Sequence, residues 1–296
     1  MSEPKQIAES RQANFQAWEE AAAQDRQTQR ERIASEVFLA ALGSTENFKH
    51  KIFLKGGVLV GAVYESGRNT ADLDFSTTLQ PSKDFLDKLE IELIAALPSA
   101  AALVGSPNTI IKVQSVKYRP RPETFVEADA PAIEVKFAFA DKGTKSEERL
   151  KSGISTDIIY ADISFNEEIS CVEEICIGET GLSFFAYSKS DLIAEKLRST
   201  LQQKIRKRNR RQDVYDLWFI LENYETSTEE MLAIRDAFIQ KCRSRGIEPT
   251  ELSFFDAEVI ERSRSEWDTL ESEVTYLPEF DQAFGVVQKF YNQLWK

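Results

Sequence analysis

From near residue 180 onward, the spacing of apolar residues no longer predicts strands, and this change limits the folds that the chain can adopt. Up to that point, short apolar runs predict β-strands at residues 52–54, 71–79, 109–118, 132–140, 157–165 and 169–177. Beyond it, apolar residues recur every three or four positions almost to the end, which predicts helices. The sequence therefore predicts an α+β fold in which a mixed sheet precedes an all-helical part.

Helices are also expected among the strands. Residues 1–42 are rich in Ala, Gln, Glu and Arg, which favour helix. Residues 58–64 fit a short helix, and residues 82–97 fit a longer one with Ser82 as its cap. Residues 142–151 are expected to form a charged loop.

These segments suggest three parts. We expect an N-terminal helical extension over residues 1–30, a sheet-containing domain over residues 31–180 and a helical domain over residues 181–296. In the last part, Ser188 followed by Asp191 resembles a helix-capping pair. Further helices are expected near residues 229–243, 255–271 and 280–295.

Composition excludes several classes of protein. No apolar run approaches the ~18–20 residues that a membrane span needs, and the polar N-terminus lacks a signal segment, so a cytoplasmic protein is expected. Three cysteines are too few for a disulfide framework. The single histidine, His50, lies in a polar stretch and is expected on the surface. Zinc sites and histidine-dependent nucleophiles are therefore disfavoured.

Asp72 and Asp74 form the first candidate site. Side chains alternate along a strand, so both carboxylates project from one face while Leu73 and Phe75 face the core. Two such carboxylates repel each other, and a divalent cation turns the repulsion into attraction. Mg²⁺ prefers hard oxygen ligands of this kind. An isolated D-x-D pair is more often simply solvated.

Gly56 and Gly57 end the strand that precedes this pair. Two adjacent glycines allow the backbone to approach a phosphate closely, and the helix that follows offers free N–H groups. A tight strand-to-helix turn without any ligand explains the same residues equally well.

A third carboxylate is sought on another strand. Asp162 is an acid in an otherwise apolar strand, where burial is unfavourable unless the acid is paired or bound to a metal. Glu134 is the competitor, but its neighbour on the same face is Lys136, which suggests a solvated face. We prefer Asp162.

Lys196 and Asp213 are the candidates in the helical part. Lys196 borders an apolar stripe, where it either extends its amine to solvent or binds an anionic phosphate. Asp213 opens the next helix, where an acid is favoured by the helix dipole in any case.

A basic segment separates these two residues. Residues 196–211 contain eight Lys and Arg and no acid, although the whole chain has a net charge of −12. Such a segment is usually a solvated loop, but beside a catalytic site it could hold RNA phosphates. The candidate RNA-binding residues are Lys204, Arg206, Lys207, Arg208, Arg210 and Arg211.

Taken together, these motifs resemble the AbiEii-type nucleotidyltransferase toxins, which include the MenT toxins and belong to the polymerase-β superfamily. The resemblance covers about residues 30–225. It rests on LKGG at residues 54–57, RNTADLD at 68–74, DISF at 162–165, DLIAEKL at 191–197 and DVYDLW at 213–218. Two positions depart from the family pattern: Val58 replaces a common Ser or Thr, and Gln212 replaces a common Arg.

The resemblance implies a role for each candidate. Asp72, Asp74 and Asp162 would bind Mg²⁺ or Mn²⁺, and Gly56 and Gly57 would approach the triphosphate. Lys196 would contact phosphates, Asp213 would be a further catalytic acid, and Thr70 and Arg68 would lie near the nucleotide. The implied fold is a polymerase-β-like domain followed by a helical domain that completes the active site.

The implied activity is transfer of nucleotides from a nucleoside triphosphate to RNA, with the 3′ acceptor end of tRNA as the favoured target. Such a toxin would block translation and be countered by an antitoxin. Transfer to a protein or to a small hydroxyl compound is a second hypothesis, which the net charge of −12 favours slightly. A non-catalytic binding module on the same fold is a third.

Overall fold

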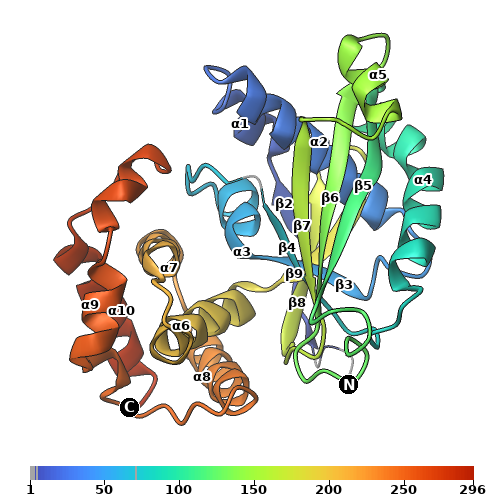
Figure 1. Ribbon diagram of the computed structural model, residues 1–296. Helices are drawn as coiled ribbons and strands as arrows, with labels where there is room; N and C mark the ends of the chain where they lie inside the picture. The colour runs from blue at the N-terminus through green and yellow to red at the C-terminus, as the bar shows by residue number, and fades with distance from the viewer. Residues whose placement is uncertain (1–3, 5, 71) are drawn as a thin grey trace. The chain divides into compact units, whose positions relative to one another are not determined.

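The computed structural model describes residue 4, residues 6–70 and residues 72–296 (Figure 1). Internal contacts divide the chain into two compact units. Unit 1 contains the described residues up to Val63, Thr70–Glu167 and Val172–Ala186, and unit 2 contains Tyr64–Asn69, Glu168–Cys171 and Tyr187–Lys296. Two short segments that precede residue 180 thus belong to the helical unit, which periodicity alone did not indicate. The described residues before 30 belong to the sheet-containing unit.

A mixed sheet forms the centre of unit 1. In the described residues it has nine strands, in the order β1-β8-β9-β3-β4-β7-β6-β5, with β2 paired to β8. The strands are β1 (Gln6–Ile7), β2 (Arg11–Ala13), β3 (Ile52–Lys55), β4 (Leu73–Thr77), β5 (Thr109–Arg119), β6 (Ala132–Asp141), β7 (Ile158–Ser164), β8 (Cys171–Ile177) and β9 (Ser183–Tyr187).

The pairing of these strands confirms the expected α+β class with a mixed sheet. β4 is parallel to β7, and β3 is parallel to β9. The pairs β3–β4, β6–β7 and β5–β6 are antiparallel. Six strands were expected within one or two residues of their bounds, whereas β9 was missed. The predicted start of β4, Ala71, lies outside the described residues.

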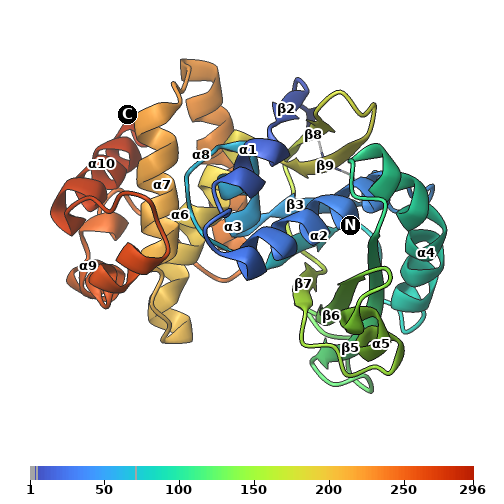
Figure 2. The same ribbon diagram turned by 90° about the horizontal axis from the view of Figure 1, so that it is seen from above.

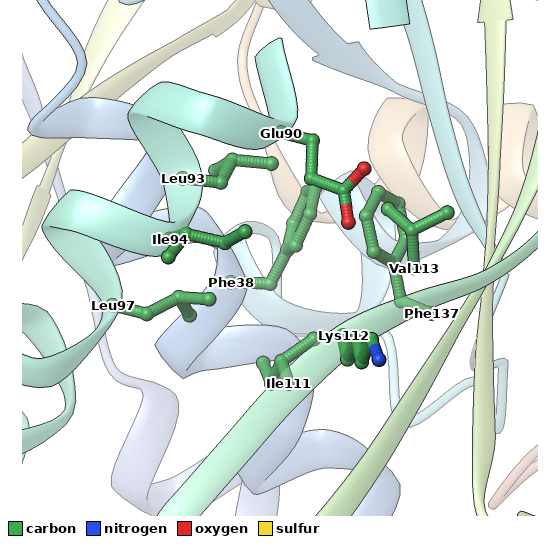
Figure 3. A pocket seen from close by; sticks show the side chains of 9 residues that line it. All are labelled: Phe38, Glu90, Leu93, Ile94, Leu97, Ile111, Lys112, Val113 and Phe137. Carbon is green, nitrogen blue, oxygen red and sulfur yellow. The ribbon is translucent and has the colours of Figure 1, made fainter. Parts of the chain in front are cut away.

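Helices α2 (Arg26–Gly43) and α4 (Phe85–Leu103) lie side by side over one face of the sheet (Figure 1). Phe38 of α2 packs between them and the sheet, with ring centroids 6.1 Å from Phe75 and 4.7 Å from Phe137. A small apolar pocket remains where Phe38, Leu93, Leu97 and Ile111 converge (Figure 3). Its volume of about 10 Å³ is close to the minimum for one water, so this pocket is a packing gap.

Three expectations for unit 1 are wrong. The chain start is not one helix: β1 and β2 are strands, and helix α1 (Phe15–Glu20) begins only at the Asn14 cap, because the sheet edge at β8 offers backbone partners. Ser82 is not a helix cap, since α4 begins at Phe85. The charged loop contains helix α5 (Lys145–Lys151), in which acids occupy the first turn and bases the last.

The helix after the glycine pair is shorter and less regular than expected. It consists of α3 (Gly56–Val58) and a π-helical turn at Leu59–Val63. His50 is exposed as expected, and its ring lies 4.8 Å from that of Phe185.

Unit 2 is helical, as expected. Its helices are α6 (Lys189–Arg206), α7 (Arg211–Asn223), α8 (Thr228–Arg243), α9 (Ala257–Arg264) and α10 (Phe280–Gln293). Helix α6 packs against α7 and α8, and α7 packs against α10 (Figure 2). The hydroxyl of Ser188 accepts a hydrogen bond of 3.3 Å from the backbone N–H of Asp191, which confirms the cap. The helix expected over residues 255–271 is interrupted after α9, where Glu266 adopts a positive φ of 60°.

No helix in the described part of the chain is both long and apolar enough to cross a membrane.

Candidate active site

Asp72, Asp74 and Asp162 line one pocket of unit 1. Asp72 is exposed and directly precedes β4, and Asp74 is the second residue of that strand. Asp74 lies directly opposite Asp162 in the parallel pair β4–β7. The pocket has a volume of about 220 Å³, and its lining consists of Asp72, Asp74, Glu134, Tyr160, Ala161 and Asp162. The sheet therefore brings together acids that are far apart in the sequence, and it includes the competing acid Glu134 as well.

A row of charged side chains crosses five strands at this pocket. Lys117 of β5 lies opposite Glu134 of β6, and Glu134 lies opposite Asp162 of β7. Asp162 in turn lies opposite Asp74 of β4, and Asp74 lies opposite Lys55 of β3. Residues paired across a sheet project from the same face. Three acids therefore lie in the middle of the row, with one lysine at each end.

Gly56 lies against the carboxylate of Asp74. Its φ is +75°, and a Cβ at this position would be 2.2 Å from Oδ2 of Asp74. Only glycine both tolerates this backbone conformation and leaves space for the carboxylate. Gly56 thus makes room for Asp74, a role that the sequence did not reveal. The predicted contact of Gly56 and Gly57 with a triphosphate stays a prediction.

Two cations near the pocket were not identified from the sequence. Nη2 of Arg119 forms an ion pair with Oδ2 of Asp162, and 42% of the Arg119 side chain is exposed. Lys55 forms a largely buried ion pair with Glu167. The Glu167 carboxylate also accepts a 2.5 Å hydrogen bond from Oγ of Ser76. In the sequence, Arg119 directly follows the strand that was expected over residues 109–118. The pairing of that strand with β6 became known only from the structure.

Lys196 is the centre of a buried charge cluster in unit 2. Its Nζ donates to Oδ2 of Asp216 at 2.6 Å and to Oδ1 of Asp213 at 3.3 Å. Nη1 of Arg68 donates to the same Asp216 oxygen at 2.6 Å. Ser199 donates to Oδ2 of Asp213 at 2.5 Å. With only 4% of its side chain exposed, Lys196 does not extend to solvent, so that alternative is wrong.

Lys196 and Asp213 are both charged at neutral pH. Burial would lower the pKa of Lys196, but the negative charges of Asp216 and Asp213 outweigh burial and raise this pKa above its ordinary value of 10.5. Burial would raise the pKa of Asp213, but Lys196, Arg210 and the Ser199 hydroxyl lower it below the ordinary 3.8. Asp213 is the third residue of α7 and belongs to this cluster, so it is more than a helix-dipole acid.

Asp216 was missed as a site residue. It is fully buried and accepts from both cations of the cluster. Its signal in the sequence was its position one turn after Asp213 on the same helix. Arg68 was expected near the nucleotide, and the structure pairs it with Asp216. Thr70 is half-buried, and no contact of its side chain tests its predicted role.

The basic segment of residues 204–211 divides into paired and exposed side chains. Lys204 pairs with Asp256 at 2.6 Å and Arg211 with Glu266 at 3.1 Å. Arg210 lies 3.8 Å from Asp213. Arg206, Lys207 and Arg208 are exposed. Partial burial, followed by repulsion from Arg245, Arg198, Arg208 and Arg210, lowers the pKa of Arg206, which indicates a local concentration of positive charge.

A family model described as "Nucleotidyl transferase AbiEii toxin, Type IV TA system" matches residues 37–286, which is most of the chain. The chain belongs to the AbiEii family. The resemblance noted from the motifs is thereby confirmed, and the protein is a nucleotidyltransferase toxin of a toxin–antitoxin system. Membership in such a system implies an antitoxin and a nucleotide substrate. It also counts against the non-catalytic alternative.

Solved structures support the fold of this AbiEii family member. MenT4, a nucleotidyltransferase toxin of Mycobacterium tuberculosis H37Rv, is similar with a TM-score of 0.54 and 15% identity, over 96% of this chain and 90% of that one. A protein of Helicobacter pylori named as a candidate nucleotidyltransferase is similar with a TM-score of 0.51 and 12% identity, over 91% and 95% of the two chains. No curated protein sequence matches the chain.

Nucleotidyltransferases generally use divalent metal ions, and the pocket of this AbiEii chain has suitable donors. Asp72 and Asp74 provide hard carboxylate oxygens, and the space at Gly56 accommodates the Asp74 carboxylate closely. In the described residues, no group of three or more His, Cys, Asp or Glu side chains is already arranged to hold a metal ion. The three-acid metal site therefore stays a prediction, and Asp162 is engaged by Arg119.

Proposed function

We propose that this AbiEii toxin transfers a nucleotide from a nucleoside triphosphate to RNA in the presence of Mg²⁺, and that its acceptor is the 3′ end of tRNA. The observation that carries the proposal is the row of acids across the sheet, with Asp74 opposite Asp162 in a pocket that Asp72 also lines. Family membership supplies the class of reaction, and the row supplies the residues for it.

The acids of the pocket are proposed as the magnesium ligands. Asp72 and Asp74 are the primary pair, and Asp162 is the third ligand. When bound, Mg²⁺ would favour the attacking hydroxyl and the departing pyrophosphate by stabilising negative charge. The chain's own part is to hold the carboxylates in place, which Gly56 does for Asp74 by its lack of a Cβ. In the reaction, the acceptor oxygen bonds to the α-phosphorus as the bond to pyrophosphate breaks.

Lys196 and Asp213 are proposed as further catalytic residues of the same enzyme. Their support is the cluster in unit 2 in which the buried Lys196 contacts both Asp213 and Asp216, residues of the stretches that carry the family resemblance. Lys196 would contact phosphate groups, and Asp213 and Asp216 would hold its amine in position. Gly57, Arg68 and Thr70 remain proposed nucleotide-binding residues.

RNA is proposed as the acceptor because positive charge gathers at the end of α6. Arg206, Lys207 and Arg208 are exposed there, and repulsion among neighbouring arginines marks the same place. RNA phosphates would relieve that repulsion. Lys204 and Arg211 already have acidic partners and would contribute less.

Radiolabelled transfer tests the proposal directly. The full chain is incubated with Mg²⁺, each of the four labelled nucleoside triphosphates and either tRNA, ribosomal RNA or a bacterial protein extract. We expect label in tRNA with at least one nucleotide, its loss with a metal chelator, and its loss in Asp72→Asn. Label in protein alone would favour the second class of acceptor. An absence of transfer from all four nucleotides would contradict the proposal.

A further inference from the structure

Arg119 forms an ion pair with Asp162, which is proposed as a metal ligand. Its Nη2 forms an ion pair with Oδ2 of Asp162, the residue directly opposite Asp74. About a third of the Asp162 side chain and 42% of the Arg119 side chain are exposed, so the ion pair is accessible to solvent and its partners can exchange. Arg119 ends β5, which is the last strand of the sheet order, and its backbone lies opposite Ala132 of β6.

We propose that Arg119 is an exchangeable counter-ion of the active site. Before metal binds, it neutralises Asp162. Once a divalent cation takes the Asp162 carboxylate, Arg119 is released to bind a phosphate of the incoming nucleoside triphosphate. This inference rests on the proposed function, because it assumes that Asp162 is a metal ligand.

The charges around the pocket support such an exchange. Asp72, Asp74, Glu134 and Asp162 line it together, so that four carboxylates share a small volume. Arg119 forms an ion pair with Asp162, whereas Lys55, at the other end of the row, pairs with Glu167. A divalent cation competes for the same oxygens. The triphosphate of the incoming nucleotide then adds negative charge, with which the released Arg119 pairs.

Arginine suits the second half of the exchange. Its planar guanidinium presents a fork of donors that matches two phosphate oxygens at once, and it stays charged at any relevant pH. Lys117 lies two residues earlier on the same strand, opposite Glu134 and not Asp162. It therefore carries the same charge on the same strand without the contact that defines the proposal, and it is the matched control.

Two measurements on the full chain test the exchange. Binding of Mn²⁺ is measured without nucleotide by titration calorimetry or electron paramagnetic resonance, and binding of a non-hydrolysable nucleoside triphosphate is measured with Mg²⁺ present. In Arg119→Gln we expect Mn²⁺ to bind about two- to fivefold more tightly, because an ion pair that competes with it is gone. We expect the nucleotide to bind about tenfold more weakly, because a charged hydrogen bond to phosphate is lost. Opposite changes in the two affinities are the signature of exchange.

Controls separate this inference from the proposed function. Lys117→Gln should change both affinities clearly less than Arg119→Gln, and Arg119→Lys should restore part of the nucleotide affinity. Equal effects of Lys117→Gln and Arg119→Gln, or an unchanged Mn²⁺ affinity in Arg119→Gln, would overturn the role of Arg119. Asp72→Asn tests the site itself. If Asp72→Asn binds Mn²⁺ as tightly as the wild type, both the metal site and the proposed function are contradicted.

Discussion

The absence of a Cβ at Gly56 matters for two reasons, its backbone conformation and its contact with Asp74. The α-carbon of this residue lies beside the Asp74 carboxylate, and its positive φ is one that other residues adopt only with strain. Both requirements act together at this position. At Gly105 the φ of +79° is similar, but a Cβ there would meet nothing within 4 Å. A comparison of substitutions at Gly56 and Gly105 therefore distinguishes the effect of backbone strain, which both share, from displacement of Asp74, which only the substitution at Gly56 causes.

Gly56→Ala is therefore expected to lower activity, whereas Gly105→Ala is not. Each should reduce the free energy of unfolding by about 1–2 kcal/mol through backbone strain. In Gly56→Ala the new Cβ also displaces Asp74, and a displacement of about 1 Å at a catalytic group can reduce the rate about a hundredfold. Transfer assays and denaturant unfolding of both variants measure the two effects. Similar activities of the two variants would contradict the proposed importance of the Asp74 position.

Lys196 gives a second prediction at this scale, for stability. Removing one partner of a buried ion pair leaves an uncompensated charge, which costs about 3–5 kcal/mol. Lys196→Met should lower the free energy of unfolding by this amount, since it leaves the fully buried Asp216 with only Arg68. The exposed pair of Lys204 with Asp256 is the control, and Lys204→Met should change stability by less than about 1 kcal/mol. Urea unfolding at pH 7 compares the two.

Among the elements, α1 and α2 share a pair of acidic side chains at their contact. Glu36 of α2 is buried and shares a hydrogen bond with Glu19 of α1. Burial, then the hydrogen bond and the charge of Glu19, raises the pKa of Glu36 to about 9. Nearby, Arg32 donates to the backbone carbonyl of Trp18 and lies over its ring. The hydrogen bond between the two carboxyl groups requires that one of them carries a proton.

This pair predicts a loss of stability with rising pH. Folded Glu36 keeps its proton up to about pH 9, whereas the unfolded chain releases it near pH 4.5. Stability should therefore decrease across this window. Glu36→Gln keeps a hydrogen-bond donor and does not titrate. We expect it to be more stable than the wild type at pH 9 by at least about 1 kcal/mol, or about 2–4 °C in Tm. Equal pH dependence of the two melting curves would show that Glu36 is not protonated in the fold.

For the whole molecule, the distribution of charge matters more than its sum. The net charge of −12 would repel RNA, yet three exposed cations follow one another at the end of α6. Their effect is local, because charges farther away than about 10 Å are largely screened by salt at 0.1 M. An acidic protein can therefore bind RNA through one restricted surface.

Combined replacement of Arg206, Lys207 and Arg208 by Gln should weaken tRNA binding. It should also reduce the slope of log affinity against log salt concentration by about 2, because each phosphate contact contributes about 0.7–0.9. Lys204→Gln with Arg211→Gln is the matched control, since both side chains have acidic partners and should change the slope less. Filter binding at several salt concentrations gives the slopes. An unchanged slope in the triple variant would place RNA elsewhere.

The sequence alone determined the features that depend on neighbouring residues. The period of the apolar residues predicted six of the nine strands in the described part of the chain and most of its helices, and the Ser188 cap followed from a three-residue spacing. The alternation of side chains predicted that Asp72 and Asp74 share a face, and both line the same pocket, although β4 begins only at Leu73. The same motifs sufficed to indicate the family. Where local preference and sheet pairing compete, as at the chain start, prediction from the sequence was wrong.

Only the tertiary structure decided which residues meet. Strand register places Asp74 opposite Asp162 and Asp162 opposite Glu134, and no local pattern encodes a register between strands that are far apart in the chain. Likewise, Arg119 reaches Asp162 because β5 and β6 bring it there. The position of each charge relative to the others depends on how the strands pair, and pairing is a property of the folded sheet as a whole.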